Sequence, residues 1–267
     1  MALLKTAVVG HPIAHSLSPL LHNAIYRNEG VDAEMTAIDN EHVEPLVEMM
    51  RTVPLGLTAI TLPHKQAVMP LLDEIDDTAR EIGAVNTVIN RDGKLIGYNT
   101  DIVGIAAALE GVELRGKNIL VIGAGGAAQP LAFFLHKQNI EWKCVSRNVA
   151  KTKAACEKFG GNALDAMPED GVFDIIVNTT PVGLAKSDEL PCPENLLQPG
   201  VTVFDLIYTP TKLQHVAKQK GVRVITGLSM FVAQGLEQER LWLGRKIPDS
   251  GYSALLLDHL RETSKNL

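Results

Sequence analysis

Cysteine is scarce in this chain of 267 residues, and long apolar runs are missing. The three cysteines have no C-x-x-C spacing, which excludes a disulfide framework and the common zinc and redox motifs. No window reaches the roughly 18 uninterrupted apolar residues that a membrane span requires. The N-terminal stretch MALLKTAVVG has too short an apolar run for a signal peptide and follows a strand-like pattern. We therefore expect a cytoplasmic protein without a membrane anchor.

Blocks of like charge are missing too. The 25 basic residues (Lys and Arg) and the 31 acidic ones give a formal net charge of −6, and they are spread along the chain. Nucleic acids and anionic membranes are bound by clusters of basic residues. The charge pattern therefore speaks against nucleic-acid and membrane partners and favours a small-molecule ligand.

Alternating strand and helix patterns predict an α/β protein. They run from the N-terminus to residue 61, a hairpin signal follows at Asp92-Gly93, and the alternation resumes after Asp101. The length favours two domains, because it exceeds the size at which one core usually keeps growing. We expect an N-terminal α/β substrate domain over residues 1–101 and a Rossmann-type dinucleotide-binding domain over residues 102–236. Two C-terminal helices, residues 237–267, would pack back on the first domain.

A glycine-rich turn between a strand and a helix predicts a dinucleotide site. In NILVIGAGGAAQPLAFFLHKQ, residues 118–138, Gly123, Gly125 and Ala128 occupy the G-x-G-x-x-A positions. The first glycine makes the tight turn, the second lets the backbone approach a pyrophosphate, and the alanine allows close packing of helix on strand. The same glycines would also suit a tight turn that binds nothing, so the flanking strand and helix favour the cofactor.

The next predicted strand indicates which dinucleotide binds. An acidic residue at its end would hold the ribose 2′-hydroxyl of NAD. The strand EWKCV is followed instead by SRNVAK, which places Arg147 there and Lys151 one helical turn later. These cations suit a 2′-phosphate, so the sequence predicts NADP(H) as the cofactor. The alternative is that both are solvated surface charges.

A lysine and an aspartate indicate proton transfer to or from an alcohol. Lys65 follows a strand that ends at Thr61, and Asp101 lies at the expected domain junction. We expect both to face one crevice, where Lys65 would take the proton of an alcohol as hydride leaves and Asp101 would be its partner. The alternative is that Lys65 is an ordinary exposed lysine without a catalytic role. We expect His64, which precedes Lys65, to be an ordinary surface histidine.

Two serines precede a predicted helix in HPIAHSLSPLLHN, residues 11–23. In one interpretation Ser18 is the N-cap and Pro19 takes the first helical position. In the other, Ser16 and Ser18 form a small anion site beside the helix N-terminus, where free N–H groups favour a carboxylate or phosphate. The residues alone leave both interpretations open.

Motifs along nearly the whole chain together resemble the shikimate dehydrogenase family. In order they are HPIAHSLSPLLHN, TLPHK, AVNT, GYNTD, GAGGAA, NTTPVGL, DLIYTP and MFVAQG. The resemblance implies NADPH-dependent, reversible reduction of 3-dehydroshikimate to shikimate in aromatic amino acid biosynthesis, by a monomer or homodimer. It also favours the anion site, with Ser16 and Ser18 holding the substrate carboxylate.

The resemblance implies a role for each matching residue. Lys65 and Asp101 become the catalytic pair, and the other substrate-binding residues are Thr61, Asn86, Tyr208 and Gln234. The implied cofactor-binding residues are Asp77, Gly123, Ala124, Gly125, Gly126, Ala127, Ser146, Arg147, Asn148, Lys151, Leu206 and Gly227.

The chain departs from the family pattern at three places. Ala59-Ile60-Thr61 stands where Asn-Val-Thr is common, which removes one expected polar contact to the substrate hydroxyls. Leu213 replaces a threonine after the DLIYTP motif, and Ser-Arg-Asn replaces Asn-Arg-Thr in the nucleotide motif. No departure removes a proton-transfer group.

Three other interpretations compete with this one. His11, His15 and His22 are poorly spaced for a metal and no carboxylate or cysteine joins them, so we expect no metal site. A member of the same family could prefer quinate, which adds a hydroxyl at the carboxylate-bearing carbon. An NADP-binding sensor without turnover would not need Lys65 and Asp101.

Overall fold

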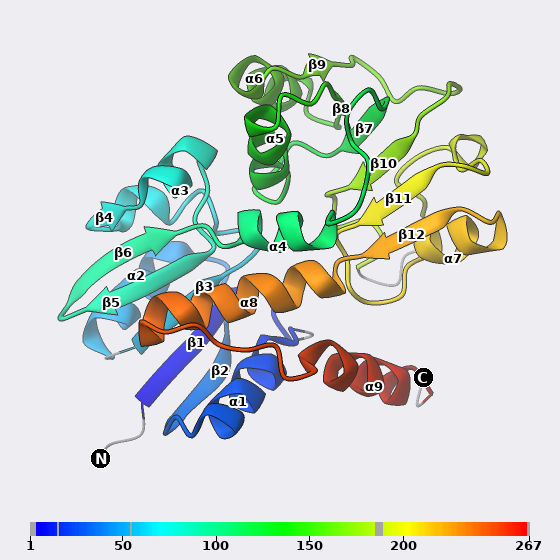
Figure 1. Cartoon of the computed structure of the whole chain (residues 1–267). Coiled ribbons are helices and arrows are strands. Elements are labelled where there is room, and N and C mark those ends of the chain that lie inside the picture. The colour runs from blue at the N-terminus through cyan, green and yellow to red at the C-terminus, as the bar shows by residue number, and fades with distance from the viewer. Residues whose placement is uncertain (1–3, 15, 54, 185–188, 266–267) are drawn as a thin grey trace. The chain divides into compact units, whose positions relative to one another are not determined.

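The computed structural model describes residues 4–14, 16–53, 55–184 and 189–265 (Figure 1). His15, one of the three histidines considered for a metal, lies outside the described residues. The chain divides into two compact units, the first made of Met1–Val103 with Val232–Leu267 and the second of Gly104–Phe231. Each unit is built on a six-stranded sheet.

The sheet of the first unit is mixed. Its strands are β1 (Leu4–Gly10), β2 (Ala33–Asp39), β3 (Leu55–Ile60), β4 (Glu74–Ile75), β5 (Thr87–Arg91) and β6 (Lys94–Tyr98), in the order β2-β1-β3-β5-β6-β4. β1, β2 and β3 pair in parallel, and β5 pairs antiparallel with both β3 and β6. The hairpin predicted at Asp92-Gly93 is confirmed, and both residues have positive φ angles, 53° and 90°.

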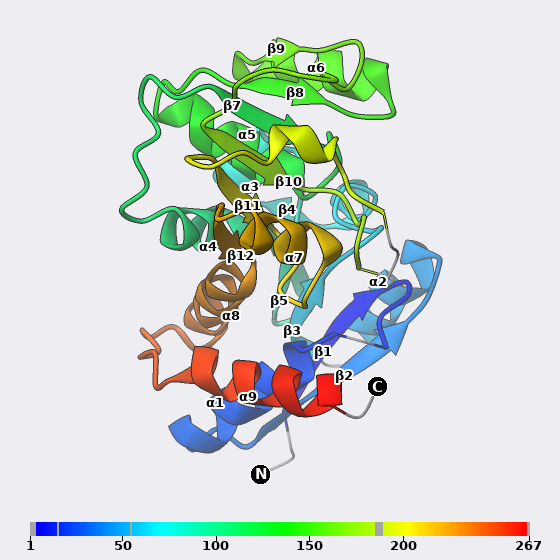
Figure 2. The ribbon, with the colours of Figure 1, turned by 90° about the vertical axis from the view of Figure 1, so that its right-hand side faces the viewer.

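Helices cover both faces of this sheet. They are α1 (Ser18–Glu29), α2 (Val43–Thr52), α3 (Asp77–Ile82), α9 (Tyr252–Lys265), the start of α4 (Asp101–Ala108) and most of α8 (Leu228–Leu243). On one face, Leu46 and Met50 of α2 join the apolar core of the sheet. On the other, Tyr26 of α1 and Trp242 of α8 pack over Leu57. α9 contacts α1 (Figure 2).

The second unit has the predicted Rossmann-type sheet. Its strands are β7 (Ile119–Ile122), β8 (Lys143–Val145), β9 (Asn162–Ala163), β10 (Ile175–Asn178), β11 (Thr202–Asp205) and β12 (Arg223–Thr226), all parallel and in the order β12-β11-β10-β7-β8-β9. Its helices include α5 (Ala128–Lys137), α6 (Val149–Phe159) and α7 (Lys212–Gln219). The strand order reverses between β7 and β10, and ligands of such sheets bind beyond the carboxyl ends of the strands at that point.

A glycine separates the two C-terminal helices. α8 ends at Leu243, and the next residue, Gly244, has a φ of 68°, which favours glycine. In the described part of the chain, no helix is long and apolar enough to cross a membrane.

Candidate active site

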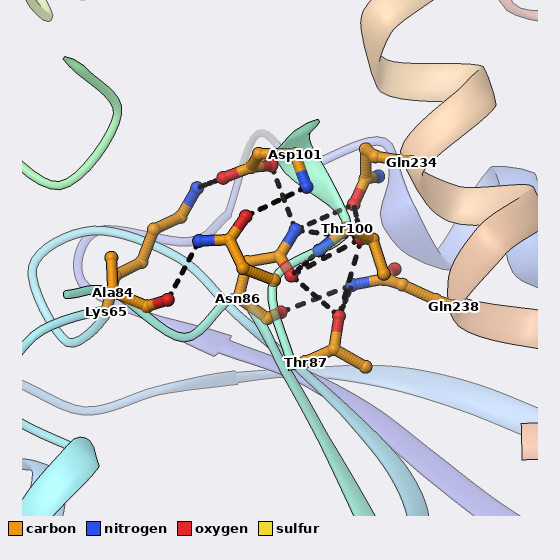
Figure 3. A network of polar contacts seen from close by, with 9 residues as sticks. Lys65, Ala84, Asn86, Thr87, Thr100, Asp101, Gln234 and Gln238 are labelled. Atoms are coloured by element: carbon orange, nitrogen blue, oxygen red, sulfur yellow. Dashed lines mark hydrogen bonds and ion pairs between the residues drawn. The ribbon is translucent and has the colours of Figure 1, made fainter. Parts of the chain in front are cut away.

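Lys65 and Asp101 form a direct ion pair in the first unit (Figure 3). Lys65 Nζ donates a hydrogen bond to Asp101 Oδ2 at 2.6 Å. Lys65 lies in the turn after β3, together with the half-buried Thr61, and Asp101 is the first residue of α4. The two side chains are 14% and 6% exposed. The structure thus brings together the two residues expected to face one crevice, in a geometry that can exchange a proton with a bound hydroxyl.

Asn86 donates a hydrogen bond to the second carboxylate oxygen of Asp101. Its Nδ2 lies 2.9 Å from both Asp101 Oδ1 and Thr100 Oγ1 and donates to them. Its Oδ1 accepts hydrogen bonds of 2.8 Å from Thr100 N and from Thr87 Oγ1. Both carboxylate oxygens of Asp101 therefore have partners, which fixes the orientation of the carboxylate toward the lysine.

Helix α8 supplies two glutamines to this network (Figure 3). Gln234 Oε1 accepts from Asn86 Nδ2 and from Thr100 Oγ1, each at 3.3 Å. Gln238 Nε2 donates to Thr87 Oγ1 at 2.9 Å and to the Asn86 carbonyl at 3.2 Å. Residues four apart share a helix face. Sequence reasoning missed Gln238, although its spacing from Gln234 was the signal that could have found it.

Sequence reasoning also missed Thr87, Asn99 and Thr100. Asn99 Oδ1 accepts from Asp101 N at 3.1 Å, and Asn99 Nδ2 donates to the Ala84 carbonyl at 2.8 Å. All three lie inside the AVNT and GYNTD motifs, so the motifs marked the right segments without distinguishing which side chain faces which partner.

Ser16 and Ser18 lie at the N-terminus of α1. The helix begins at Ser18 and its N-cap residue is Leu17, so the interpretation of Ser18 as the N-cap is wrong. Leucine has no side-chain acceptor, and Ser16 Oγ instead accepts from the Ser18 N–H at 3.3 Å. The serines therefore stand beside a helix start where N–H groups favour an anion.

Asp39 anchors the loop that leads to these serines. Its Oδ1 lies 2.6 Å from His11 Nδ1, and its Oδ2 accepts from Ile13 N at 2.9 Å. The His11 hydrogen bond lowers the pKa of Asp39, and the same bond raises the pKa of His11. The loop is thus tied to the carboxyl end of β2.

His64 is not the surface residue that the sequence predicts. It is 2% exposed, and its Nε2 lies 2.8 Å from the Asn40 carbonyl, a partner that makes burial tolerable. His22 is also buried and contacts Glu239. Among the described residues, no three His, Cys, Asp or Glu side chains gather as a metal site would require. The three cysteines are free and buried.

The glycine-rich turn of the second unit joins β7 to α5. Gly123 has a φ of 112°, and a Cβ there would lie 2.3 Å from Thr179 Oγ1, so only glycine fits. A Cβ at Gly125 would meet nothing within 4 Å, which leaves the backbone open to a ligand. Ala127, the N-cap residue of α5, makes no side-chain cap, and Ala128 is buried. This geometry fits a bound pyrophosphate.

Ser146 and Asn148 shape the turn after β8. Ser146 Oγ accepts from Asn148 N at 3.2 Å and lies 2.8 Å from Thr152 Oγ1. Asn148 caps α6 by accepting from Lys151 N at 3.0 Å. Arg147 and Lys151 are exposed. Exposure suits the binding of a 2′-phosphate and also suits solvated surface charges.

A buried carboxylate organises the carboxyl ends of β10 and β11. Asp205 accepts hydrogen bonds from Asn178 Nδ2 at 3.0 Å, Thr211 Oγ1 at 2.7 Å, Gln214 Nε2 at 3.1 Å and Ile207 N at 3.3 Å. Burial raises the pKa of Asp205, and these hydrogen bonds oppose the rise. The network fixes the loop after β11, at the edge where this fold binds its ligands.

The remaining predicted residues lie in both units. A Cβ at Gly227 would lie 2.0 Å from the Leu206 carbonyl oxygen, so this close approach requires glycine. Tyr208 packs on Phe231, with 4.8 Å between ring centroids. These residues belong to the second unit, whereas Asp77 is the exposed first residue of α3 in the first unit.

Comparison with known proteins decides the family. The family model described as the shikimate dehydrogenase substrate binding domain matches residues 8–88, and the model of the shikimate 5′-dehydrogenase C-terminal domain matches residues 227–250. A shikimate dehydrogenase (NADP(+)) of Pyrococcus abyssi is 41% identical over 244 residues, which cover 89% of this chain and 91% of that protein. The chain belongs to the shikimate dehydrogenase family.

Solved structures of shikimate dehydrogenases share the fold. The enzyme of Aquifex aeolicus has a TM-score of 0.87 and 36% identity, covering 94% of this chain and 95% of that one. The enzyme of Thermus thermophilus, in complex with NADP(H) and shikimate, has a TM-score of 0.85 and 37% identity, covering 94% and 97%. The segment matched by the substrate-binding family model contains Lys65 and Asn86, and the C-terminal model covers Gln234.

Proposed function

We propose that the protein catalyses the reversible, NADPH-dependent reduction of 3-dehydroshikimate to shikimate, in the cytoplasm, as a step of aromatic amino acid biosynthesis. The observation that carries the proposal is the Lys65–Asp101 pair, at 2.6 Å and largely buried, in one network with Asn86 and Gln234. Membership of the shikimate dehydrogenase family supports the same reaction.

Lys65 acts as the proton donor for reduction. NADPH, when bound, would supply the hydride to the carbonyl carbon. Lys65 Nζ gives a proton to the carbonyl oxygen, so hydride and proton together convert the ketone into the alcohol. In the reverse direction the neutral amine of Lys65 takes the hydroxyl proton. Asp101 Oδ2 accepts from Nζ and keeps the lysine directed at the reacting oxygen.

The substrate is held at its two polar ends. Ser16 and Ser18 bind the carboxylate, with the N-terminus of α1 adding favourable charge. Thr61, Asn86 and Gln234 bind the ring hydroxyls, and the resemblance to the family assigns Tyr208 to the substrate as well. Ala59 is buried among apolar side chains, so this chain makes one contact fewer where an asparagine is common in the family.

NADP(H) binds at the carboxyl edge of the second sheet. The turn over Gly123, Ala124, Gly125, Gly126 and Ala127 would hold the pyrophosphate, because it offers backbone N–H groups without side-chain obstruction at Gly125. The turn after β8 reads Ser146-Arg147-Asn148 and carries no acidic side chain, so Arg147 and Lys151 are free to take the 2′-phosphate. By resemblance to the family, Leu206 and Gly227 would contact the nicotinamide, and Asp77 is assigned to the cofactor on the same ground. The first unit is thus the substrate unit, the second the cofactor unit.

A steady-state assay tests the proposal. Shikimate and quinate are each oxidised with NADP and with NAD, and kcat/KM is measured for all four combinations. The expected result is the highest kcat/KM for shikimate with NADP. A higher value for quinate would reassign the substrate. Binding of NADP without turnover of either acid would contradict an enzymatic role and favour a sensor. Light scattering of the purified chain distinguishes a monomer from a homodimer.

A further inference from the structure

A buried histidine–glutamate hydrogen bond joins two helices of the first unit next to the proposed substrate site. His22 of α1 and Glu239 of α8 are 217 residues apart in sequence, and both side chains are 0% exposed. His22 Nδ1 contacts Glu239 Oε1 directly. Among the described residues, His22 Nε2 and Glu239 Oε2 have no hydrogen-bond partner. The cost of burying both groups is therefore only partly offset.

Stability is a poor explanation for such a pair. Replacing a buried ion pair by apolar residues of similar volume is often neutral or stabilising, because two charges no longer have to leave water. A pair that adds little stability can still fix how two elements meet, since its hydrogen bond forms in only one arrangement. The pair is thus better explained by geometry.

On the α1 side, the pair lies one helical turn from the proposed carboxylate site. Ser18 and His22 are four residues apart and share a face of the helix. Leu21, beside them, packs closely against α8, because a Cβ on Gly235 would lie 2.7 Å from Leu21 Cδ2 and 3.6 Å from His22 Nε2. Any rotation or sliding of α1 against α8 would therefore move the serine hydroxyls.

On the α8 side, the pair adjoins the network that holds the catalytic aspartate. Gly235 and Glu239 face α1, whereas Gln234 and Gln238, each one residue earlier, bond to Asn86. Helix α8 thus contacts α1 along one row of residues, and along the adjacent row it contacts the network around Asn86.

We infer that His22 and Glu239 are positioning residues that fix α1 against α8 and so set the distance between the hydroxyls of Ser16 and Ser18 and the Lys65–Asp101 pair. The inference rests on the proposed function, because it takes the two serines as the carboxylate site. Neither residue touches the substrate. They act through the helices that carry the binding groups.

The test separates positioning from stability. The double variant His22→Leu/Glu239→Leu keeps the approximate volume and removes both polar side chains. Its thermal unfolding temperature should stay near that of the wild type, while the KM for shikimate rises about 10-fold or more, because a misplacement of about 1 Å can cost about 100-fold. The KM for NADP should not change. Calorimetric titration with shikimate alone should show the same loss of affinity.

A matched control uses an ion pair that joins the other end of α1 to the chain just after α8. Arg245 contacts Glu29 at the C-terminal end of α1, far from the serines. Arg245→Met should leave the KM for shikimate unchanged. Glu239→Gln, which keeps the side-chain shape, is the second test variant should the double variant fail to fold, and it should raise the KM in the same direction.

Two results would overturn the inference. One is an unchanged KM for shikimate in a folded double variant or in Glu239→Gln, and the other is an equal rise in Arg245→Met. If Ser16→Ala/Ser18→Ala raises the KM and the His22 and Glu239 variants do not, the proposed function stands and the positioning role fails. If the wild-type chain does not turn over shikimate at all, the proposed function itself fails.

Discussion

Replacement of Lys65 by methionine removes the proposed proton donor and keeps an unbranched side chain of similar reach. Positioned acid–base groups contribute about 100- to 10,000-fold to rate. Because Lys65 Nζ and Asp101 Oδ2 lie 2.6 Å apart in a largely buried site, water is poorly placed to substitute. We expect kcat to fall about 100-fold or more, with a smaller change in the KM for shikimate.

Lys65→Met should also lower the free energy of unfolding, by an amount that can be estimated from the hydrogen bonds of Asp101. Asp101 loses one charge-assisted hydrogen bond and retains that from Asn86 Nδ2 at 2.9 Å. A hydrogen bond to a charged group is worth about 1.5–3 kcal/mol, so the free energy of unfolding should fall by about that amount. Lys94→Met is the matched control. Lys94 contacts Glu74 with exposed fractions of 49% and 54%, and an exposed pair is worth at most about 1 kcal/mol.

The assay combines steady-state kinetics with urea unfolding of the wild type, Lys65→Met and Lys94→Met. A fall in kcat without loss of folded protein at the assay temperature supports the proton-transfer role. Near-normal turnover by Lys65→Met would refute it, whatever the stability. A loss of activity in Lys94→Met as large as that in Lys65→Met would show that the effect is not specific to the pair.

Three further predictions concern binding and pH. Ser16→Ala/Ser18→Ala should mostly raise the KM for shikimate, by about 10-fold or more, because each charge-assisted hydrogen bond is worth about 1.5–3 kcal/mol. Lower thermal stability with an unchanged KM would instead assign the serines a structural role. Arg147→Ala should lower kcat/KM for NADP about 10- to 150-fold and leave that for NAD nearly unchanged, and equal losses would mean that the arginine only supports its loop. The hydrogen bond between His11 and Asp39 raises the pKa of the histidine and lowers that of the aspartate. Its contribution to the free energy of unfolding is present in full between about pH 4 and about pH 6.5, and it is lost as pH rises through the raised pKa of His11 or falls through the lowered pKa of Asp39. Asp39→Asn should therefore lower stability in urea more at pH 5.5 than at pH 8.5, and an equal loss at both would contradict the linkage.

Much of the fold follows from local patterns in the sequence. Buried runs such as the one over β7 are apolar at every position, and the hairpin turn at Asp92-Gly93 needs two residues that tolerate positive φ. These signals are carried by neighbouring residues, so no long-range information is required. The exact start of α1 is harder to predict from the sequence. Serine is a common N-cap residue and leucine is not, yet the N-cap is Leu17 and the helix begins one residue later, at Ser18.

The sequence predicts which segments form the site, but it does not predict which side chains bond to each other. The motifs placed Lys65, Asn86 and Asp101 on three segments that the sheet brings together. Their hydrogen-bond partners depend on side-chain directions that only packing decides, which is why Gln238 was missed. His64 was misjudged for the same reason, since its partner is a backbone carbonyl supplied by a distant loop.

The split of the first unit into two chain segments has a consequence for its assembly. Residues Gly104–Phe231 form one uninterrupted segment, whereas the first unit needs Val232–Leu267 to be complete. During synthesis at about 5–20 residues per second, Glu239, which follows His22 by 217 residues, is added about 10 to 40 s after it. From the synthesis of Asp101 until that of Gln234, the nascent chain carries Lys65 and Asp101 but lacks Gln234 and Gln238. A chain that ends after Asp101 but before Leu228 therefore carries the proposed proton donor and lacks the helix that supplies Gln234 and Gln238.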